Sequence, residues 1–440
     1  MDPLTGGIVA GLIANGITEV ARCVTPVSAA QSRRELALED ILRKDPSVAE
    51  ILQKAVVAVA KSVHFQDGRQ TEKLRLFFLS PEAEAVVRQM CGLYFAPGMR
   101  SKSEGAIQQE FSLSLALYLG LDETTIRPTA SLLFEILLEA CDRALSVAVD
   151  KGILAGHEAR SSVRHRALLD EIASIQKNVD FLLQPDRPKL EDIHQFEHKY
   201  RAQLAERHGY IVPPHFDVAR KIPMKDICVP PRLALVTRNR SDQGEPVKFA
   251  TFLAGLYRAV VLANPGGGKS TLASRICHDL AADHRVRILG GRQLTAALII
   301  LRDYGAAKKE HACSFVQFIE LVANSHYQIP PPKGAVEYML LNGRLMVIFD
   351  GLDELIDTRH RQEISADIES FCNLYPSVPI LVTSREVGGS SNKESGGAAT
   401  AGRSTDARPD SLGWQSSALV NATRPAVAAL RSRFACGQNL

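Results

Sequence analysis

The stretch that decides the fold is Ala259-Val-Val-Leu-Ala-Asn-Pro-Gly-Gly-Gly-Lys-Ser-Thr271. Its apolar beginning, Ala259 to Ala263, predicts a buried β-strand. Leu272, Ile276 and Leu280 follow at a spacing of four and predict a helix with one apolar face. A glycine-rich turn between a strand and a helix is typical of a phosphate-binding loop, so the stretch predicts a P-loop nucleotide-binding domain.

Each part of the predicted loop has a chemical reason. The glycines from Gly266 to Gly268 let successive backbone N–H groups point at an anion, and the helix that follows adds its positive N-terminal end. We expect Lys269 to reach the β- and γ-phosphates and the Ser270 hydroxyl to ligate Mg²⁺. Ala263 departs from the usual pattern because it stands in the place of the first glycine. The candidate nucleotide-binding residues are Asn264, Pro265, Gly266, Gly267, Gly268, Lys269, Ser270 and Thr271.

A second motif, Leu345-Met-Val-Ile-Phe-Asp-Gly-Leu-Asp-Glu-Leu355, lies further along the chain. Its apolar beginning predicts another short buried strand, with Asp350 at the carboxyl end, where ligands bind in open parallel sheets. There Asp350 is expected to support the Mg²⁺ ion, directly or through water. Asp353 and Glu354 follow as candidates to orient or deprotonate the attacking water.

A third motif is the strand Ile380-Leu-Val382 followed by Thr383-Ser-Arg385. It places the Arg385 guanidinium at the same predicted edge of the sheet, where arginine can bind a γ-phosphate with two hydrogen bonds. Alone this motif is weak, because an arginine after a strand is usually a surface residue. The three motifs in this order indicate a nucleoside triphosphatase.

Together the motifs resemble the NACHT family of signalling ATPases, which belong to the STAND class of P-loop switches. The similarity runs from Tyr257 to Val387, and Asp350-Gly-Leu-Asp-Glu354 is its most specific part. Arg258-Ala-Val-Val261 is similar to the family's first core strand, and Leu298-Ile-Ile-Leu-Arg-Asp-Tyr304 is similar to its second.

The resemblance implies ATP or ADP binding, slow hydrolysis, and nucleotide-gated oligomerisation that activates an attached effector. Carried over by position, Lys269 and Ser270 bind the phosphates and Mg²⁺, and Asp350 supports the metal. Asp353 and Glu354 are then the candidates for hydrolysis. Arg385 matches the family's first sensor arginine.

Composition is consistent with a soluble multidomain protein. The chain has 440 residues, of which 45% are hydrophobic, so it can form two or three domains with cores of their own. The net charge of +3 is too small to favour nucleic acid as a partner. The eight cysteines show neither Cys-x-x-Cys pairs nor zinc spacing, and no signal peptide or apolar membrane span is recognised. We therefore expect a cytoplasmic protein with reduced thiols.

The N-terminal half is predicted to be a helical domain, residues 1–205, that serves as an effector or adaptor. The stretches Pro81 to Met90 and Ala130 to Glu139 are rich in helix-forming residues. An apolar seam from Leu168 to Leu182 predicts a bundle helix, since it is too short for a coiled coil. Gln184-Pro-Asp-Arg-Pro188 ends that helix, and a polar helix to His208 follows.

Two segments of this half allow other interpretations. Pro3 to Thr18 is uncharged and glycine-rich, which allows a membrane-active helix, but a buried first helix of the bundle is favoured. His194-Gln-Phe-Glu-His198 matches the His-x-x-Glu-His pattern of zinc peptidases. Its polar surroundings favour a solvated helix face instead.

The remaining segments are predicted to be an extended connector, residues 206–256, an incomplete NTPase core, residues 257–388, and a disordered tail, residues 389–440. After Val387 the apolar period is lost, and neither the further strand nor the lid domains of the family are recognised. The predicted fold is thus a helical domain joined to a three-layer α/β P-loop domain with a parallel sheet.

The predicted function is an ATP-binding signalling switch, and the family resemblance implies a role in bacterial antiviral or stress defence. Its expected partners are ATP, further copies of itself and a protein bound by the helical domain. The alternative is a non-catalytic interaction protein whose helical half binds a partner and whose truncated NTPase half is inactive.

Overall fold

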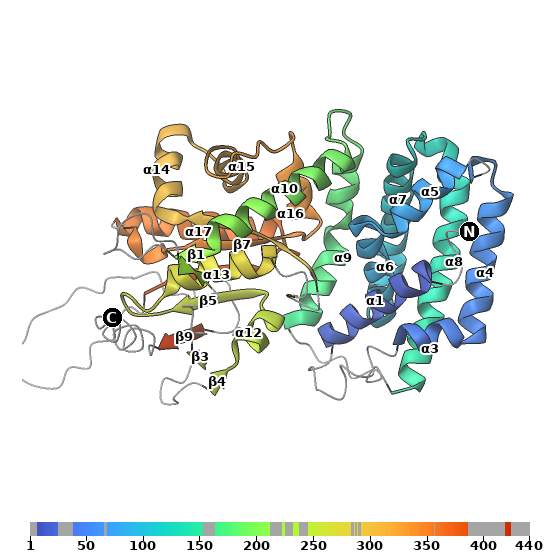
Figure 1. Cartoon of the computed structure of the whole chain (residues 1–440), viewed down its shortest axis with the longest axis horizontal. Coiled ribbons are helices and arrows are strands. Elements are labelled where there is room, and N and C mark those ends of the chain that lie inside the picture. The colour runs from blue at the N-terminus through green and yellow to red at the C-terminus, as the bar shows by residue number, and fades with distance from the viewer. Residues whose placement is uncertain are drawn as a thin grey trace, which may run out of the picture.

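A computed structural model describes most of the chain as two bodies, a bundle of helices and a helix-covered sheet (Figure 1). The described residues are 7–24, 38–65, 68–152, 163–211, 222–224, 232–236, 245–282, 286, 288, 292–355, 357–385 and 419–423.

The N-terminal body, here called the helical module, consists of the helices before residue 183. Its elements are α1 (Ile8–Val24), α3 (Leu38–Lys44), α4 (Pro46–Lys61), η1 (Val63–Phe65), α5 (Gly68–Phe78), α6 (Pro81–Phe95), α7 (Pro97–Leu119), α8 (Glu123–Asp150) and α9 (Val163–Leu182). The side chains of Asp45, Ser80 and Asp122 cap α4, α6 and α8 by accepting bonds from first-turn N–H groups, which have no partner within a helix.

The core of this module agrees with the apolar patterns of the sequence. Helix α1 packs against α6, and its Ile13, Ile17 and Val20 are fully buried, which confirms the prediction of a buried first helix. The seam from Leu168 to Leu182 is buried on α9 against α7, as predicted for a bundle helix. Residues Pro3 to Gly6 of the predicted uncharged segment lie outside the described residues.

Helix α10 (Leu190–His208) belongs by its contacts to the second body. It buries Ile193, Phe196, Tyr200 and Leu204, and it packs along α13 (Lys269–Ala282). Since the polar sequence of α10 contains one narrow apolar face, the helix is held against the NTPase core by that face.

The second body contains a sheet with the strand order β4-β3-β9-β5-β8-β7-β6. Its strands are β3 (Arg232–Val236), β4 (Glu245–Val247), β5 (Arg258–Leu262), β6 (Thr295–Ile300), β7 (Leu345–Asp350), β8 (Ile380–Ser384) and β9 (Leu419–Thr423). Strands β5, β8, β7 and β6 are parallel, so their carboxyl ends meet at one edge, here called the carboxyl edge. The opposite edge, where these strands begin, is called the amino edge.

Helices cover both faces of this sheet and give the predicted three layers. Helix α13 packs against β6, β7 and β8, with α10 beyond it. The remaining elements of this body are α12 (Phe249–Gly255), α14 (Leu301–His311), α15 (Phe315–Ser325), α16 (Ala335–Leu341), η2 (Leu352–Glu354) and α17 (Thr358–Leu374). Phe349 of β7 meets Phe315 of α15 and Phe371 of α17, with ring centroids 4.8 and 5.9 Å away.

Two predicted irregular segments contribute to the sheet. The predicted connector supplies β3, β4 and α12, besides the small antiparallel pair β1 (Tyr210–Ile211) and β2 (Ile222–Pro223). Within the predicted disordered tail, residues 419–423 form β9, which pairs in parallel with β5 and antiparallel with β3. The prediction that no core strand follows Val387 is therefore wrong at β9, while the rest of the tail lies outside the described residues.

Candidate functional site

The glycine-rich loop lies between β5 and α13 at the carboxyl edge, as the sequence predicts. Gly266 and Gly268 have φ angles of 67° and 85°, in the left-handed region that favours glycine. A Cβ on Gly267 would lie only 2.8 Å from the carbonyl oxygen of Asn264. All three glycines are thus required by the shape of the loop.

The loop presents its polar groups to solvent. Asn264, Ser270 and Thr271 are exposed, and Lys269 is half-buried with its Nζ donating to the carbonyl oxygen of Ala263 at 3.1 Å. Because α13 begins at Lys269, its first N–H groups also lie at this loop. Backbone N–H groups, an ammonium group and a hydroxyl group form a suitable donor set for a nucleotide phosphate with its Mg²⁺.

Asp350 is held in a fixed orientation at the end of β7. The hydroxyl of Thr383, at the end of the neighbouring β8, donates to Asp350 Oδ1 at 2.5 Å. The same hydroxyl accepts the N–H of Gly351 at 2.9 Å. Asp350 is 7% exposed and Thr383 is fully buried, so this bond fixes the orientation of the carboxylate inside the domain.

The chain also brings Asp350 close to the P-loop helix. Burial raises the pKa of the Cys277 thiol on α13 above its ordinary value, and the nearby charge of Asp350 raises it further. The P-loop helix and the predicted magnesium carboxylate therefore share one region of the domain.

The predicted hydrolysis residues differ in their surroundings. Gly351, with a φ of 84°, turns the chain into η2, which carries Asp353 and Glu354. Arg385 Nε lies 2.6 Å from Asp353 Oδ2, and the Asp353 side chain is 11% exposed. Glu354 is 41% exposed, and its Oε2 lies 3.7 Å from a guanidinium nitrogen of Arg302. The structure thus unites Asp353 with Arg385 and leaves Glu354 facing solvent.

Two residues of this site were missed by reasoning from the sequence. Thr383 stands inside the quoted Thr-Ser-Arg motif, so its place at a strand end beside Asp350 was the available signal. Arg302 follows β6, and its pairing with Glu354 depends on the turn at Gly351, which has no pattern in sequence.

Comparison with known families agrees with this geometry. Residues 258–401 match the model of the NACHT domain. This segment is a NACHT-family P-loop NTPase domain. The match covers roughly a third of the chain and supports nucleotide binding and a general signalling role. No curated protein matches the sequence.

The His-x-x-Glu-His motif on α10 is engaged in another way. His194 Nε2 lies 2.8 Å from Glu82 Oε1, and Glu197 accepts from Thr295 Oγ1 at 2.8 Å and pairs with Arg344. The predicted solvated face is correct for the exposed His198 and wrong for Glu197, which is 8% exposed. Over the described part of the chain, no cluster of three or more potential metal ligands occurs.

The length and apolar character of the described helices are relevant to the alternative of a membrane-active segment. Among them, none combines the length and the apolar character that a bilayer span needs.

Proposed function

We propose that the chain is a nucleotide-gated signalling switch in which the NACHT domain binds and slowly hydrolyses ATP. The observation that carries this proposal is the meeting of three distant motifs at one sheet edge. The glycine cradle with Lys269, the oriented carboxylate of Asp350, and the Asp353–Arg385 pair all lie where the parallel strands end.

The proposed binding roles follow from the groups present. The N–H groups of the loop from Asn264 to Thr271 hold the phosphates, and Lys269 exchanges its bond to Ala263 for a bond to them. Ser270 and Asp350 hold Mg²⁺, with Thr383 keeping the carboxylate aimed. Magnesium bound there would neutralise charge on the phosphate oxygens.

The surroundings of the two acidic residues favour different roles in hydrolysis. Glu354 faces solvent and has a distant partner, so we assign it to the attacking water. Asp353 is committed to Arg385 and holds that guanidinium at the carboxyl edge. Arg385, which is 52% exposed, can then meet a γ-phosphate and leave Asp353, so its position reports which nucleotide is bound.

The proposed output is self-association of the NACHT domain and activation of the helical module as an effector or adaptor. Bacterial antiviral or stress defence in the cytoplasm is the setting that the family resemblance supports. These further roles rest on the nucleotide site.

The rate at which the protein hydrolyses ATP that is already bound, measured in a single turnover, tests the assignment of the acidic residues. We expect Glu354→Gln to retain ATP while slowing hydrolysis about 100-fold or more, because the variant cannot accept a proton from water. Asp353→Asn should instead disturb the response to the γ-phosphate, seen as a smaller difference between ATP and ADP affinities.

The matched control is Glu310→Gln on α14, where the side chain is 72% exposed and lies 3.7 Å from His311. It should hydrolyse ATP at the wild-type rate. A Glu354→Gln protein with wild-type turnover would show that another group activates the water.

A further inference from the structure

The helical module contacts the NACHT domain at the amino edge of the sheet, opposite the nucleotide site (Figure 1). Before β5, Tyr257 donates its hydroxyl to Asp170 of α9 at 2.8 Å. Before β8, the carbonyl oxygen of Leu374 accepts from Lys177 of α9 at 3.1 Å. The module also contacts the segments before β6 and β7, described next. It therefore meets the segment that leads into each of the four parallel strands.

The segment before β7 is the centre of this contact. It is the turn Asn342-Gly343-Arg344, which joins α16 to the strand that carries Asp350. Asn342 and Asn178 of α9 exchange two amide hydrogen bonds, of 3.0 and 2.8 Å. The Gly343 carbonyl accepts from Arg292, which precedes β6 and lies 3.8 Å from Glu171 of α9.

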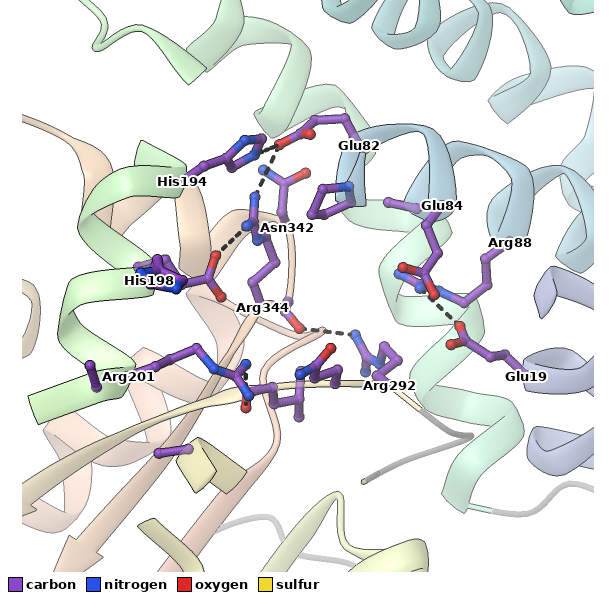
Figure 2. Close-up of a pocket in the computed structure, with 18 residues that line it drawn as sticks. Glu19, Glu82, Glu84, Arg88, His194, His198, Arg201, Arg292, Asn342 and Arg344 are labelled. Carbon is purple, nitrogen blue, oxygen red and sulfur yellow. Dashed lines mark hydrogen bonds and ion pairs between the residues drawn. The ribbon is translucent and has the colours of Figure 1, made fainter. Parts of the chain in front are cut away.

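Arg344 forms the strongest link across this contact. Its Nη1 lies 3.0 Å from Glu82 Oε1 of α6 (Figure 2). Its Nη2 pairs with Glu197 of α10. Glu82 also meets His194 at 2.8 Å and the Tyr338 hydroxyl at 3.1 Å. The Glu82 side chain is 3% exposed, so its charge is compensated by groups outside the helical module.

The charge state of Glu82 agrees with this arrangement. Burial alone would raise the pKa of Glu82, but the hydrogen bond from His194 and the charge of Arg344 outweigh it and lower the pKa to about 2. The carboxylate therefore stays ionised at any physiological pH.

The space beside this pair is an open cavity rather than a packed core. A cavity of about 530 Å³ lies between α6, α10 and the turn, and charged side chains form much of its wall (Figure 2). Arg88 is already paired with Glu19 and Glu171, and Arg344 with Glu82 and Glu197. These existing partners favour a hydrated seam between two bodies over a site for a separate anion.

We propose that the helical module is a separable body docked on the amino edge of the NACHT sheet, and that the Glu82–Arg344 pair is the latch that holds it there. Most of the contacts named above are polar and can exchange for water, while Phe181 of α9 adds an apolar contact with Tyr338 of α16, at a ring-centroid distance of 5.6 Å. The chain from residue 183 to 189, between α9 and α10, connects the two bodies covalently and contains Pro185 and Pro188. Opening would uncover Asn342-Gly343-Arg344 without touching the carboxyl edge.

Hydrogen–deuterium exchange on the full chain, without nucleotide, tests this inference. Glu82→Gln keeps the shape of the side chain and removes its charge, which leaves Arg344, whose side chain is only 14% exposed, less compensated. We expect backbone amides of two segments, 80–85 and 342–344, to exchange at least about tenfold faster, while α8 and β7 keep their wild-type protection.

The matched control is Glu139→Gln, which removes the exposed 3.1 Å pair with Lys54 inside the helical module. It should leave the exchange of both segments unchanged. Asn342→Ala removes the milder amide contact, and it should reproduce the same local pattern with a smaller increase. If Glu82→Gln does not fold, exchange measured on Asn342→Ala tests the proposal instead.

Two results would overturn the proposal. One is wild-type exchange at both segments in Glu82→Gln, or in Asn342→Ala if the first variant does not fold. The other is acceleration spread evenly over α8 and β7, which would mean that the two bodies unfold as one unit.

Discussion

At the scale of single residues, two buried carboxyl groups of the helical module, Glu82 and Glu110, differ in charge. Glu82 has three polar partners besides Arg344 and stays ionised. Glu110 of α7 is equally buried, but among the described residues its Oε2 has no hydrogen-bond partner, and its Oε1 accepts from Asn178 at 2.5 Å. Burial therefore raises the pKa of Glu110 to about 8, so this carboxyl group carries a proton at neutral pH.

Glu110 should make the stability of the protein depend on pH. The pKa of this carboxyl group is near 8 in the folded protein and has an ordinary value near 4.5. Its protonation therefore contributes fully to the free energy of unfolding below pH 4.5. That contribution is lost as the pH rises through about 8, and each pKa unit corresponds to about 1.4 kcal/mol. We expect Glu110→Gln to match the wild type near pH 5 and to exceed its free energy of unfolding near pH 8.5.

Urea unfolding at both pH values measures this difference. Glu104→Gln, on the same helix but with a side chain 42% exposed, is the matched control and should follow the wild type. If the free energy of unfolding changed equally with pH in the wild type and in Glu110→Gln, Glu110 would be ionised in the folded protein.

The positions of the proposed nucleotide-binding residues in the fold were predictable, because each belongs to a motif with a fixed backbone context. The places of Lys269, Ser270 and Asp350 follow from strand-to-loop order alone. The Asp353–Arg385 and Asp350–Thr383 contacts were not predictable, since they require that β8 lies between β5 and β7. That strand order is a property of the folded sheet.

At the scale of elements, the turn between α16 and β7 requires glycine at position 343. Gly343 has a φ of 58°, and a Cβ there would lie 2.6 Å from Arg292 Nη1 and 3.1 Å from the carbonyl oxygen of Ser377. The turn therefore needs glycine both for its backbone and for the close approach of the segments before β6 and β8.

Gly343→Ala should lower the free energy of unfolding by at least about 1–2 kcal/mol, the cost of a left-handed conformation in a residue with a Cβ. Chemical denaturation measures the change. Gly105→Ala, in the exposed interior of α7, meets no atom within 4 Å and should leave stability unchanged or raise it. Equal stability of Gly343→Ala and the wild type would mean that the turn relaxes without strain.

Elements with a strong local pattern were predicted well, and elements defined by distant partners were not. Helices α6 and α8 contain stretches of strong helix formers, α9 has an apolar seam, and strands β5, β7 and β8 have apolar runs. Strand β9 is a short segment whose partners, β3 and β5, lie far away in the sequence. The core position of α10 had a local signal, because Ile193, Phe196, Tyr200 and Leu204 recur every three or four residues.

At the scale of the whole molecule, the two edges of one parallel sheet have different proposed roles. The carboxyl edge holds the P-loop and the acidic residues, and the amino edge receives the helical module. Strand β7 joins the two, with Arg344 directly before it and Asp350 at its end. Nucleotide and helical module thus act on opposite ends of the same strand, and neither blocks the other.

The central claim is that the glycine cradle at the carboxyl edge binds nucleotide. Calorimetric titration of nucleotide-stripped, full-length protein with Mg-ATP and Mg-ADP, beside Lys269→Ala, tests it most directly. We expect binding in about the micromolar range for the wild type and at least about tenfold weaker binding for the variant, because a charge-assisted contact to the phosphates is lost. Equal affinities of the two proteins, or no binding by a folded wild-type protein, would contradict it.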